Sequence, residues 1–348
     1  MVIDALANEV QFLDHLAPVW HALPDVSRGT FMVEPRLVRR AEELGIVATP
    51  TPRPPRVPAY PPPRTDGPPL LVASYGDIKV GRRLGFGPFA FIEHGAGQSY
   101  AGDPRWVNQL ISGSYAGGPD RADVELFMVP NSHAADRWRA AYPEARVELV
   151  GSPKLDTLPR RDAGPGPVVA ISFHFQAPMS LPPEAQTAIG EYRPLLGDLA
   201  ARFTTIGHAH PKADWPAQLE RIYRKAGIPF VASFDDVCRQ ADVYVCDNSS
   251  TLFEFASTGR PVVLLNSKFY RRNIHHGLRY WEAATVGLQC DRPEDLLATI
   301  EQALEDPIDQ QRARDAALDI VYQPRTNGAA YAGTAIQDWL ASRHVRAA

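Results

Sequence analysis

The sequence predicts an α/β protein made of two Rossmann-like domains facing a cleft. Three observations predict this fold. Short apolar runs alternate with amphipathic segments along all 348 residues, a pattern typical of helices packed on parallel sheets. A hydrophobic content of 45% in a chain of this length is enough for two cores rather than one. A charged segment rich in glycine and proline, RRDAGPGP at residues 160–167, separates the two series.

Residues 1–160 are predicted to form an N-terminal Rossmann-like domain. Its strands are predicted at Val2–Leu6, Thr30–Val33, Ile46–Ala48, Leu70–Ala73, Phe89–Ile92, Val124–Val129 and Arg146–Val150. Helical spacing is predicted at Phe12–Leu23, Arg36–Leu44 and Ser132–Tyr142, with a helix or loop at Tyr75–Leu84. Residues 53–69 read RPPRVPAYPPPRTDGPP, and proline lacks the amide donor, so we expect a loop or semi-rigid connector there. A proline-rich ligand for a signalling domain is the alternative interpretation.

Residues 161–328 are predicted to form a C-terminal Rossmann-like domain. Its strands are predicted at Val168–Ser172, Thr204–Ile206, Pro229–Ala232, Asp242–Cys246 and Pro261–Leu265. Helices are predicted within Pro183–Phe203 and at Gln218–Ala226, Phe234–Gln240, Pro293–Leu304 and Asp309–Val321. Residues 329–348 are expected to form a terminal helix that packs back on the first domain.

Charge, cysteine content and hydrophobicity indicate which partners and which compartment to expect. The net charge of −4 gives no electrostatic argument for nucleic acid, although it is compatible with a local basic groove. The three cysteines, Cys238, Cys246 and Cys290, are far apart and lack metal-ligand spacing, which favours buried thiols in a reduced compartment. The first twenty residues carry acids and no basic segment, and no apolar run is long enough to span a membrane. We therefore expect a cytoplasmic protein with at most peripheral membrane contact.

The stretch from Ala241 to Asn266, ADVYVCDNSSTLFEFASTGRPVVLLN, predicts a strand, a turn, a helix and a second strand. The helix begins with hydroxyl residues after Asn248, at Ser249, Ser250 and Thr251, and stops at Gly259. Because a helix start leaves amide N–H groups unpaired and carries the positive end of the dipole, this turn is a candidate phosphate site. The alternative is a simple helix cap by Asn248 or Ser249.

Two histidine loops follow other predicted strands. His94 comes after Phe89–Ile92 and before Gly95, and open α/β sheets bind ligands at this carboxyl edge. An imidazole there is a candidate general base, and a buried structural histidine is the alternative. His208 and His210 follow Thr204–Ile206, and His210 and Lys212 are candidate contacts to phosphate oxygens.

Glu254 lies one turn beyond Ser250, on the same face of the predicted helix. Its carboxylate is a candidate acceptor for a ribose diol, and a solvated surface carboxylate is the alternative. The sequence contains no nucleotide-binding Gly-Lys-Ser/Thr loop, no hydrolase Gly-x-Ser-x-Gly turn, no His-Glu-x-x-His pair and no Asp-x-Asp. We therefore expect no bound metal ion and no cofactor apart from the donor substrate.

These motifs resemble those of the CDP-glycerol glycerophosphotransferase, or teichoic-acid polymerase-like, family. The run ADVYVCDNSSTLFEFASTGRP is similar to the family's signature around its Asp-x-Ser-Ser turn. The run Glu93-His94-Gly95 is similar to its Trp-His-Gly loop, residues 151–156 (GSPKLD) to its Gly-x-Pro-Arg-x-Asp segment, and His210-Pro211 to its His-Pro loop. The matches run in the family's order from about residue 90 to residue 285.

This resemblance implies the glycosyltransferase B-type fold and a metal-independent transferase with a nucleotide-diphosphate donor. The group that is transferred would be linked to UDP, CDP or GDP. It implies that His94 is the base. It also implies that the C-terminal domain, residues 161–328, binds the nucleotide donor and that residues 1–160 form the acceptor-side domain. His210 and residues Ser249 to Thr251 are implied to hold the diphosphate, and Glu254 the ribose. His208, Lys212 and Asn248 are further candidates for donor binding. Gly95, Gln98, Arg271, Arg272 and His275 are further candidates for contacts to the acceptor or to phosphate.

The expected reaction moves a sugar or a glycerol-phosphate group to the hydroxyl of a glycan, a polyol phosphate or a glycoconjugate. Three alternatives stay open at this point. An isomerase of the UDP-sugar 2-epimerase type would consume the donor without an acceptor. A non-catalytic nucleotide-sugar binder would show no turnover, and a glycosyltransferase acting on nucleic-acid bases would bind DNA in a salt-dependent manner.

Overall fold

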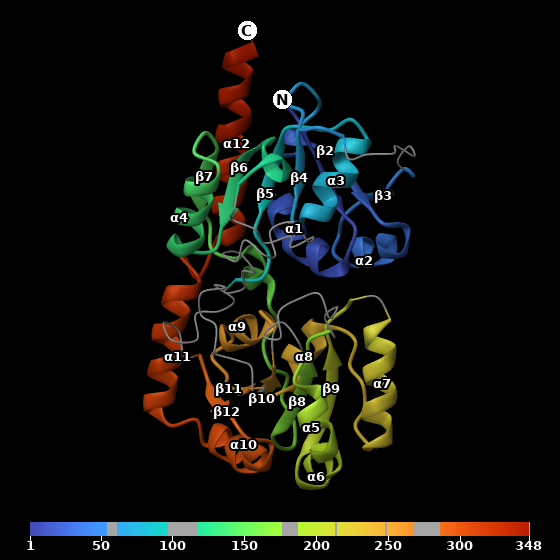
Figure 1. Ribbon diagram of the computed structural model, residues 1–348, viewed down its shortest axis with the longest axis vertical. Helices are drawn as coiled ribbons and strands as arrows, with labels where there is room; N and C mark the ends of the chain where they lie inside the picture. Colours follow the sequence, from blue (N-terminus) through green and yellow to red (C-terminus); the bar gives the residue numbers. More distant parts are fainter. Residues whose placement is uncertain are drawn as a thin grey trace. The chain divides into compact units, whose positions relative to one another are not determined.

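The structure is a computed structural model that describes residues 1–53, 61–96, 117–175, 187–212, 214–247, 249–266 and 286–347. The chain divides into two compact units (Figure 1). Unit 1 comprises Met1–Thr157 with Tyr322–Ala348, and unit 2 comprises Leu158–Val321. Each unit contains one sheet, and all of the strand pairs described are parallel. The predicted α/β class with two Rossmann-like sheets is confirmed.

The sheet of unit 1 has the strand order β3-β2-β1-β4-β5-β6-β7. Its strands are β1 (Ile3–Ala7), β2 (Arg28–Val33), β3 (Ala48–Pro50), β4 (Leu70–Val72), β5 (Phe89–Ile92), β6 (Val124–Val129) and β7 (Arg146–Leu149). The order reverses between β1 and β4, where Ala5 pairs with both Phe31 and Leu71. In open α/β sheets such a reversal point opens the crevice that binds ligands.

Helices cover both faces of this sheet. They are α1 (Val10–Ala22), α2 (Val38–Glu43), α3 (Tyr75–Arg83), α4 (Ser132–Ala141) and α12 (Gly328–Ala347). Two of them begin with a side-chain cap: Ser74 accepts a hydrogen bond from the amide of Asp77, and Asn131 accepts one from the amide of Ala134. These caps satisfy amide groups that a helix start otherwise leaves without a partner.

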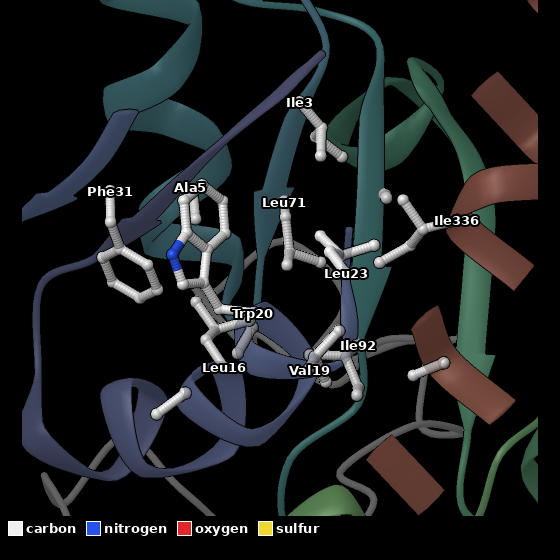
Figure 2. Close-up of a cluster of buried hydrophobic side chains, with 14 of the residues drawn as sticks. Ile3, Ala5, Leu16, Val19, Trp20, Leu23, Phe31, Leu71, Ile92 and Ile336 are labelled. Atoms are coloured by element: carbon white, nitrogen blue, oxygen red, sulfur yellow. The ribbon is translucent and has the colours of Figure 1, made fainter. Parts of the chain in front are cut away.

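Alternate residues of each strand face two separate cores. On one face, α1 and α12 pack over the strands, and Figure 2 shows Trp20 of α1 beside Phe31 with Ile336 of α12 in the same cluster. On the other face, α3 and α4 cover a cluster in which Phe127 stacks on Trp138 with ring centroids 4.5 Å apart. Strands buried on both faces are apolar at nearly every position, which is why the sequence pattern revealed them.

Unit 2 has the strand order β12-β11-β10-β8-β9. Its strands are β8 (Val168–Phe173), β9 (Thr204–Ala209), β10 (Val243–Cys246), β11 (Val262–Leu265) and β12 (Leu288–Cys290). Its helices are α5 (Ile189–Tyr192), α6 (Leu196–Arg202), α7 (Trp215–Lys225), α8 (Phe234–Gln240), α9 (Thr251–Ala256), α10 (Leu296–Glu305) and α11 (Ile308–Val321). Because the first strand, β8, lies between β9 and β10, the order reverses between β8 and β10.

Three predictions about secondary structure are wrong in detail, and one strand was not predicted. The long helix expected within Pro183–Phe203 is broken in its described part into α5, a 3-10 turn at Arg193–Leu195 and α6. The strand expected at Pro229–Ala232 is reduced to one bridge between Gly207 and Phe230, because proline at residue 229 has no amide donor. The third strand was predicted to begin at residue 46, but β3 begins at Ala48, where its pairing with β2 starts. The short, half-polar strand β12 was not predicted.

Gly207 allows β9 to pack directly against α7. A Cβ atom at this position would lie 2.4 Å from a ring carbon of Tyr223, a buried residue whose hydroxyl donates to the carbonyls of Ile171 and His208. We expect Gly207→Ala to lower the free energy of unfolding by about 1–3 kcal/mol, as overpacking does elsewhere. Urea denaturation measures the change.

Gly197→Ala is the matched control for Gly207→Ala. Gly197 lies in α6, and among the described residues nothing comes within 4 Å of the Cβ it would gain. Since alanine favours a helix over glycine by roughly 1 kcal/mol, this variant is expected to be at least as stable as the wild type. Equal stability of the two variants would contradict the steric account of Gly207.

Candidate functional site

His94 lies directly after β5, at the carboxyl edge of the unit 1 sheet. Gly95 follows with φ +77°, a left-handed conformation that glycine adopts without strain. The Nδ1 atom of His94 lies 2.5 Å from the carbonyl oxygen of Ala73. A carbonyl only accepts, so Nδ1 carries the proton in the neutral ring and Nε2 is the basic nitrogen.

Rings from α1 flank this imidazole. Phe12 meets it edge to face with centroids 4.5 Å apart, and the ring of His15 lies 6.2 Å away. The neighbouring Glu93 accepts a hydrogen bond of 2.9 Å from Nε1 of Trp138 in α4. The two residues after β5 are therefore held by different helices, His94 beside α1 and Glu93 beside α4.

A buried carboxyl group lies at the reversal point of the same sheet. Asp77, in the first turn of α3, is 1% exposed, and its Oδ1 accepts a hydrogen bond of 2.7 Å from Nδ2 of Asn8. Burial raises the pKa of Asp77 to about 7, outweighing the hydrogen bonds from Ser74 and Asn8 that favour its charged form. The sequence analysis missed Asp77, although Ser74 three residues before it forms a capping pattern.

In unit 2, the residues after β9 gather with those after β8. Register pairs Phe173 with Ala209, so the next residues of the two strands are neighbours, and the rings of His174 and His210 lie 4.8 Å apart. Nζ of Lys212 lies 5.7 Å from the centre of the Phe175 ring. His210 and Lys212 both lie beside the ring of Phe175, and His174, which was not predicted, lies next to His210.

His208 has a different environment from His210. It is 4% exposed, and its Nδ1 lies 2.9 Å from the carbonyl oxygen of Val231. β9 extends to Ala209, so His208 lies within the strand rather than after it as predicted. The ring of His208 lies near Phe234, whereas the ring of His210, beyond the strand, lies near His174. The described contacts of His208 thus join β9 to the segment that follows α7.

Asp247 organises the reversal point of unit 2. It is fully buried directly after β10 and accepts hydrogen bonds from the amide of His174 at 2.7 Å, the hydroxyl of Thr187 at 2.7 Å and the amide of Ala188 at 2.9 Å. These bonds tie the ends of β8 and β10 to the start of α5. Asp247 was not among the predicted site residues, because its partners lie about sixty or more positions away in the sequence.

The start of α9 differs from the prediction. The helix runs over Thr251–Ala256, and its N-cap, Ser250, makes no side-chain cap. The amide of Thr251 donates to Oγ of Ser249, and the amides of Leu252 and Phe253 donate to the carbonyls of Ser249 and Ser250. The amides of Thr251, Leu252 and Phe253 are therefore paired within the turn itself.

Hydroxyl groups at this turn form a chain. The Thr251 hydroxyl donates to Oγ of Ser249 at 2.8 Å and lies 2.9 Å from the hydroxyl of the buried Tyr244.

Glu254 is 2% exposed, so it is not the solvated carboxylate considered as the alternative. Of the other predicted site residues, Asn248, Gln98, Arg271, Arg272 and His275 lie outside the described residues.

Two further observations concern cofactors and membranes. Within the described ranges, no group of three or more histidine, cysteine or acidic residues has an arrangement that could hold a metal ion. The free cysteines Cys238, Cys246 and Cys290 are buried, as predicted. In the same ranges, no helix is both long and apolar enough to cross a membrane.

Residues 195–330 match the family model described as CDP-Glycerol:Poly(glycerophosphate) glycerophosphotransferase. The family resemblance is confirmed. The matched segment begins before β9 and continues beyond α9, so it includes His208, His210, Lys212 and the turn that precedes α9. The predicted enzyme class, a transferase of the glycerophosphotransferase type, is confirmed with it.

Solved structures show the same fold at low sequence identity. The wall teichoic acid polymerase TagF aligns with a TM-score of 0.56 and 12% identity over 98% of this chain and 90% of that chain. The UDP-GlcNAc 2-epimerase of Neisseria meningitidis aligns with a TM-score of 0.56 and 12% identity over 98% and 99%. A putative UDP-N-acetylglucosamine 2-epimerase of Listeria monocytogenes gives 0.60 and 14% over 99% and 96%. The predicted glycosyltransferase B-type fold is thereby confirmed.

A search of curated proteins found no match to this chain.

Proposed function

We propose that this protein transfers glycerol phosphate from CDP-glycerol to a hydroxyl group of an acceptor. The observation that carries the proposal is the match of residues 195–330 to the glycerophosphotransferase family. A variant of TagF soaked with CDPG, which aligns with a TM-score of 0.57 and 12% identity, supports the choice of donor. The acceptor is a glycan, a polyol phosphate or a glycoconjugate.

The proposed donor site lies at the carboxyl edge of the unit 2 sheet. His210 and Lys212 supply the positive groups that phosphate oxygens require, and His174 lies within the same cluster. Ser249, Ser250 and Thr251 supply hydroxyl groups beside the diphosphate. Glu254 accepts hydrogen bonds from the ribose diol. In this proposal the cations replace the divalent ion that many phosphoryl-transfer enzymes use.

His94 is the proposed general base. Its Nδ1 proton is committed to the Ala73 carbonyl, so Nε2 receives the proton of the acceptor hydroxyl. The acceptor oxygen forms a bond to the β-phosphorus of CDP-glycerol, the pyrophosphate P–O bond breaks, and CMP leaves with the bonding electrons. His210 and Lys212 stabilise the negative charge that develops on the leaving phosphate.

Thermal stabilisation by nucleotides tests the donor assignment. CDP-glycerol and CDP are expected to raise the melting temperature more than UDP, GDP or UDP-GlcNAc, because a bound ligand stabilises in proportion to ln(1 + [L]/Kd). The Ser250→Ala/Glu254→Gln variant is expected to lose this shift. Ser257→Ala, at the other end of α9, is the matched control and is expected to keep it.

Two outcomes would overturn the proposal. Stabilisation by UDP-GlcNAc alone, with consumption of that compound in the absence of any acceptor, would identify an isomerase. Stabilisation by CDP-glycerol without turnover in the presence of glycans, polyol phosphates and glycoconjugates would identify a binding protein. Release of CMP together with a phosphodiester product, observed by ³¹P NMR, is the expected result.

A further inference from the structure

Two turns hold the imidazole of His94. The turn between β4 and α3 supplies the Ala73 carbonyl, 2.5 Å from Nδ1. The turn between β1 and α1 leads into the helix whose Phe12 and His15 rings flank the imidazole. Because β1 and β4 are neighbours at the reversal point of the sheet, the orientation of His94 depends on how these two turns are fixed to each other.

Asp77 joins the two turns. Its carboxylate Oδ1 accepts a hydrogen bond of 2.7 Å from Nδ2 of Asn8, which lies between the end of β1 and the start of α1. Its backbone amide donates to Oγ of Ser74 at 3.0 Å. Ser74 directly follows Ala73, whose carbonyl accepts the hydrogen bond from Nδ1 of His94. The Asn8–Asp77 hydrogen bond therefore links the acceptor for Nδ1 to the helix that flanks the ring.

The burial of Asp77 indicates how it acts. The residue is 1% exposed, and its Oδ1 is already hydrogen-bonded to Nδ2 of Asn8. Among the described residues, its second oxygen, Oδ2, has no hydrogen-bond partner, and a buried polar atom in that condition costs free energy. The cluster thus contains a costly buried carboxyl group whose hydrogen bonds lead to the turns around His94.

We infer that Asp77 and Asn8 are positioning residues that hold His94 in the orientation and tautomer of a general base. This inference rests on the proposed function. A displaced Ala73 carbonyl would release the Nδ1 proton and allow the other tautomer, in which Nε2 carries hydrogen and cannot accept a proton. Misplacing a catalytic group by about 1 Å costs roughly 100-fold in rate.

The first part of the test is kinetic. Asp77→Ala and Asn8→Ala are each expected to lower kcat with CDP-glycerol by about 10–100-fold, with the donor KM unchanged. The double variant is expected to lose no more than either single variant, because both remove the same hydrogen bond. Asp77→Asn retains an accepting Oδ1 and is expected to restore most of the rate.

The controls separate positioning from general stability. Asn131→Ala removes the buried cap of α4 in the same unit and is expected to lower the melting temperature without lowering kcat. In a His94→Ala background, Asn8→Ala is expected to cause no further loss. A further loss there, or an unchanged kcat in both single variants, would overturn the inference.

A spectroscopic measurement tests the inference independently of the reaction. Long-range ¹H–¹⁵N spectra are expected to show His94 as the Nδ1–H tautomer in the wild type and in Asp77→Asn, and as a tautomer mixture in Asn8→Ala. An unchanged Nδ1–H tautomer in Asn8→Ala would overturn the inference. If the wild type transfers no glycerol phosphate, the proposed function fails, while these spectra still decide whether Asn8 positions His94.

Discussion

Replacing His94 by alanine is expected to lower the rate of glycerol-phosphate transfer by about 10²–10⁴-fold, the usual contribution of a general base. The physical reason is that Nδ1 donates to the Ala73 carbonyl, which leaves Nε2 as the nitrogen that receives the acceptor proton. Donor affinity is expected to stay unchanged, because the proposed donor contacts lie in unit 2. Rates of CMP release and calorimetric titration with CDP-glycerol measure the two quantities.

His21→Ala is the matched control for this variant. The ring of His21 also lies against a backbone carbonyl, with Nε2 2.8 Å from the oxygen of Leu44, but His21 is exposed in the last turn of α1. Its replacement is expected to leave the rate unchanged. Full activity in His94→Ala would eliminate His94 as the base, and a parallel loss of donor binding would point to a structural role for the residue.

The sequence predicted the fold well where burial controls the pattern. The strands β5 and β6 are buried on both faces at almost every position. β5 is therefore a continuous apolar run, and β6 is apolar except at Glu125. Prediction failed where a strand depends on its neighbours. Among the described residues, the segment after α7 forms one bridge with β9, at Phe230, supported by hydrogen bonds at Pro229 and Val231. β12 has a buried side chain only at Cys290. Tertiary pairing rather than local pattern therefore decides both cases.

Residues of the candidate site were likewise predicted where local pattern indicates them and missed where remote contacts decide them. His94 and His210 were predicted because each follows a strand, and residues at strand ends lie at the edge where ligands bind. Asp77 and Asp247 were not predicted as site residues, because their partners are remote in sequence: Asn8 for Asp77, and His174 for Asp247. No periodicity indicates such pairs. The closed turn before α9 was also missed, because the direction of a hydroxyl group depends on its local geometry.

Replacing Asp77 by asparagine is expected to stabilise unit 1 at alkaline pH. Burial raises the pKa of Asp77 from 3.8 to about 7, so the folded protein binds this proton more tightly than the unfolded chain does. The associated stability is fully present below pH 3.8 and is lost as the pH rises through 7. The wild type should therefore lose up to about 4 kcal/mol across this window, at about 1.4 kcal/mol per unit of pKa.

The asparagine variant carries no titrating proton at this position. Its free energy of unfolding, relative to that of the wild type, should therefore rise with pH and then level off. Between pH 5 and pH 8 this difference is expected to rise by about 3 kcal/mol, because the folded and unfolded wild-type protein differ in bound protons only up to the folded pKa. Calorimetric scans of both proteins measure it. Asp136→Asn, at a side chain 78% exposed in the same unit, is the control and should give no pH-dependent gain. A stability difference between Asp77→Asn and wild type that is constant with pH would mean that the buried carboxyl group is not protonated near neutrality.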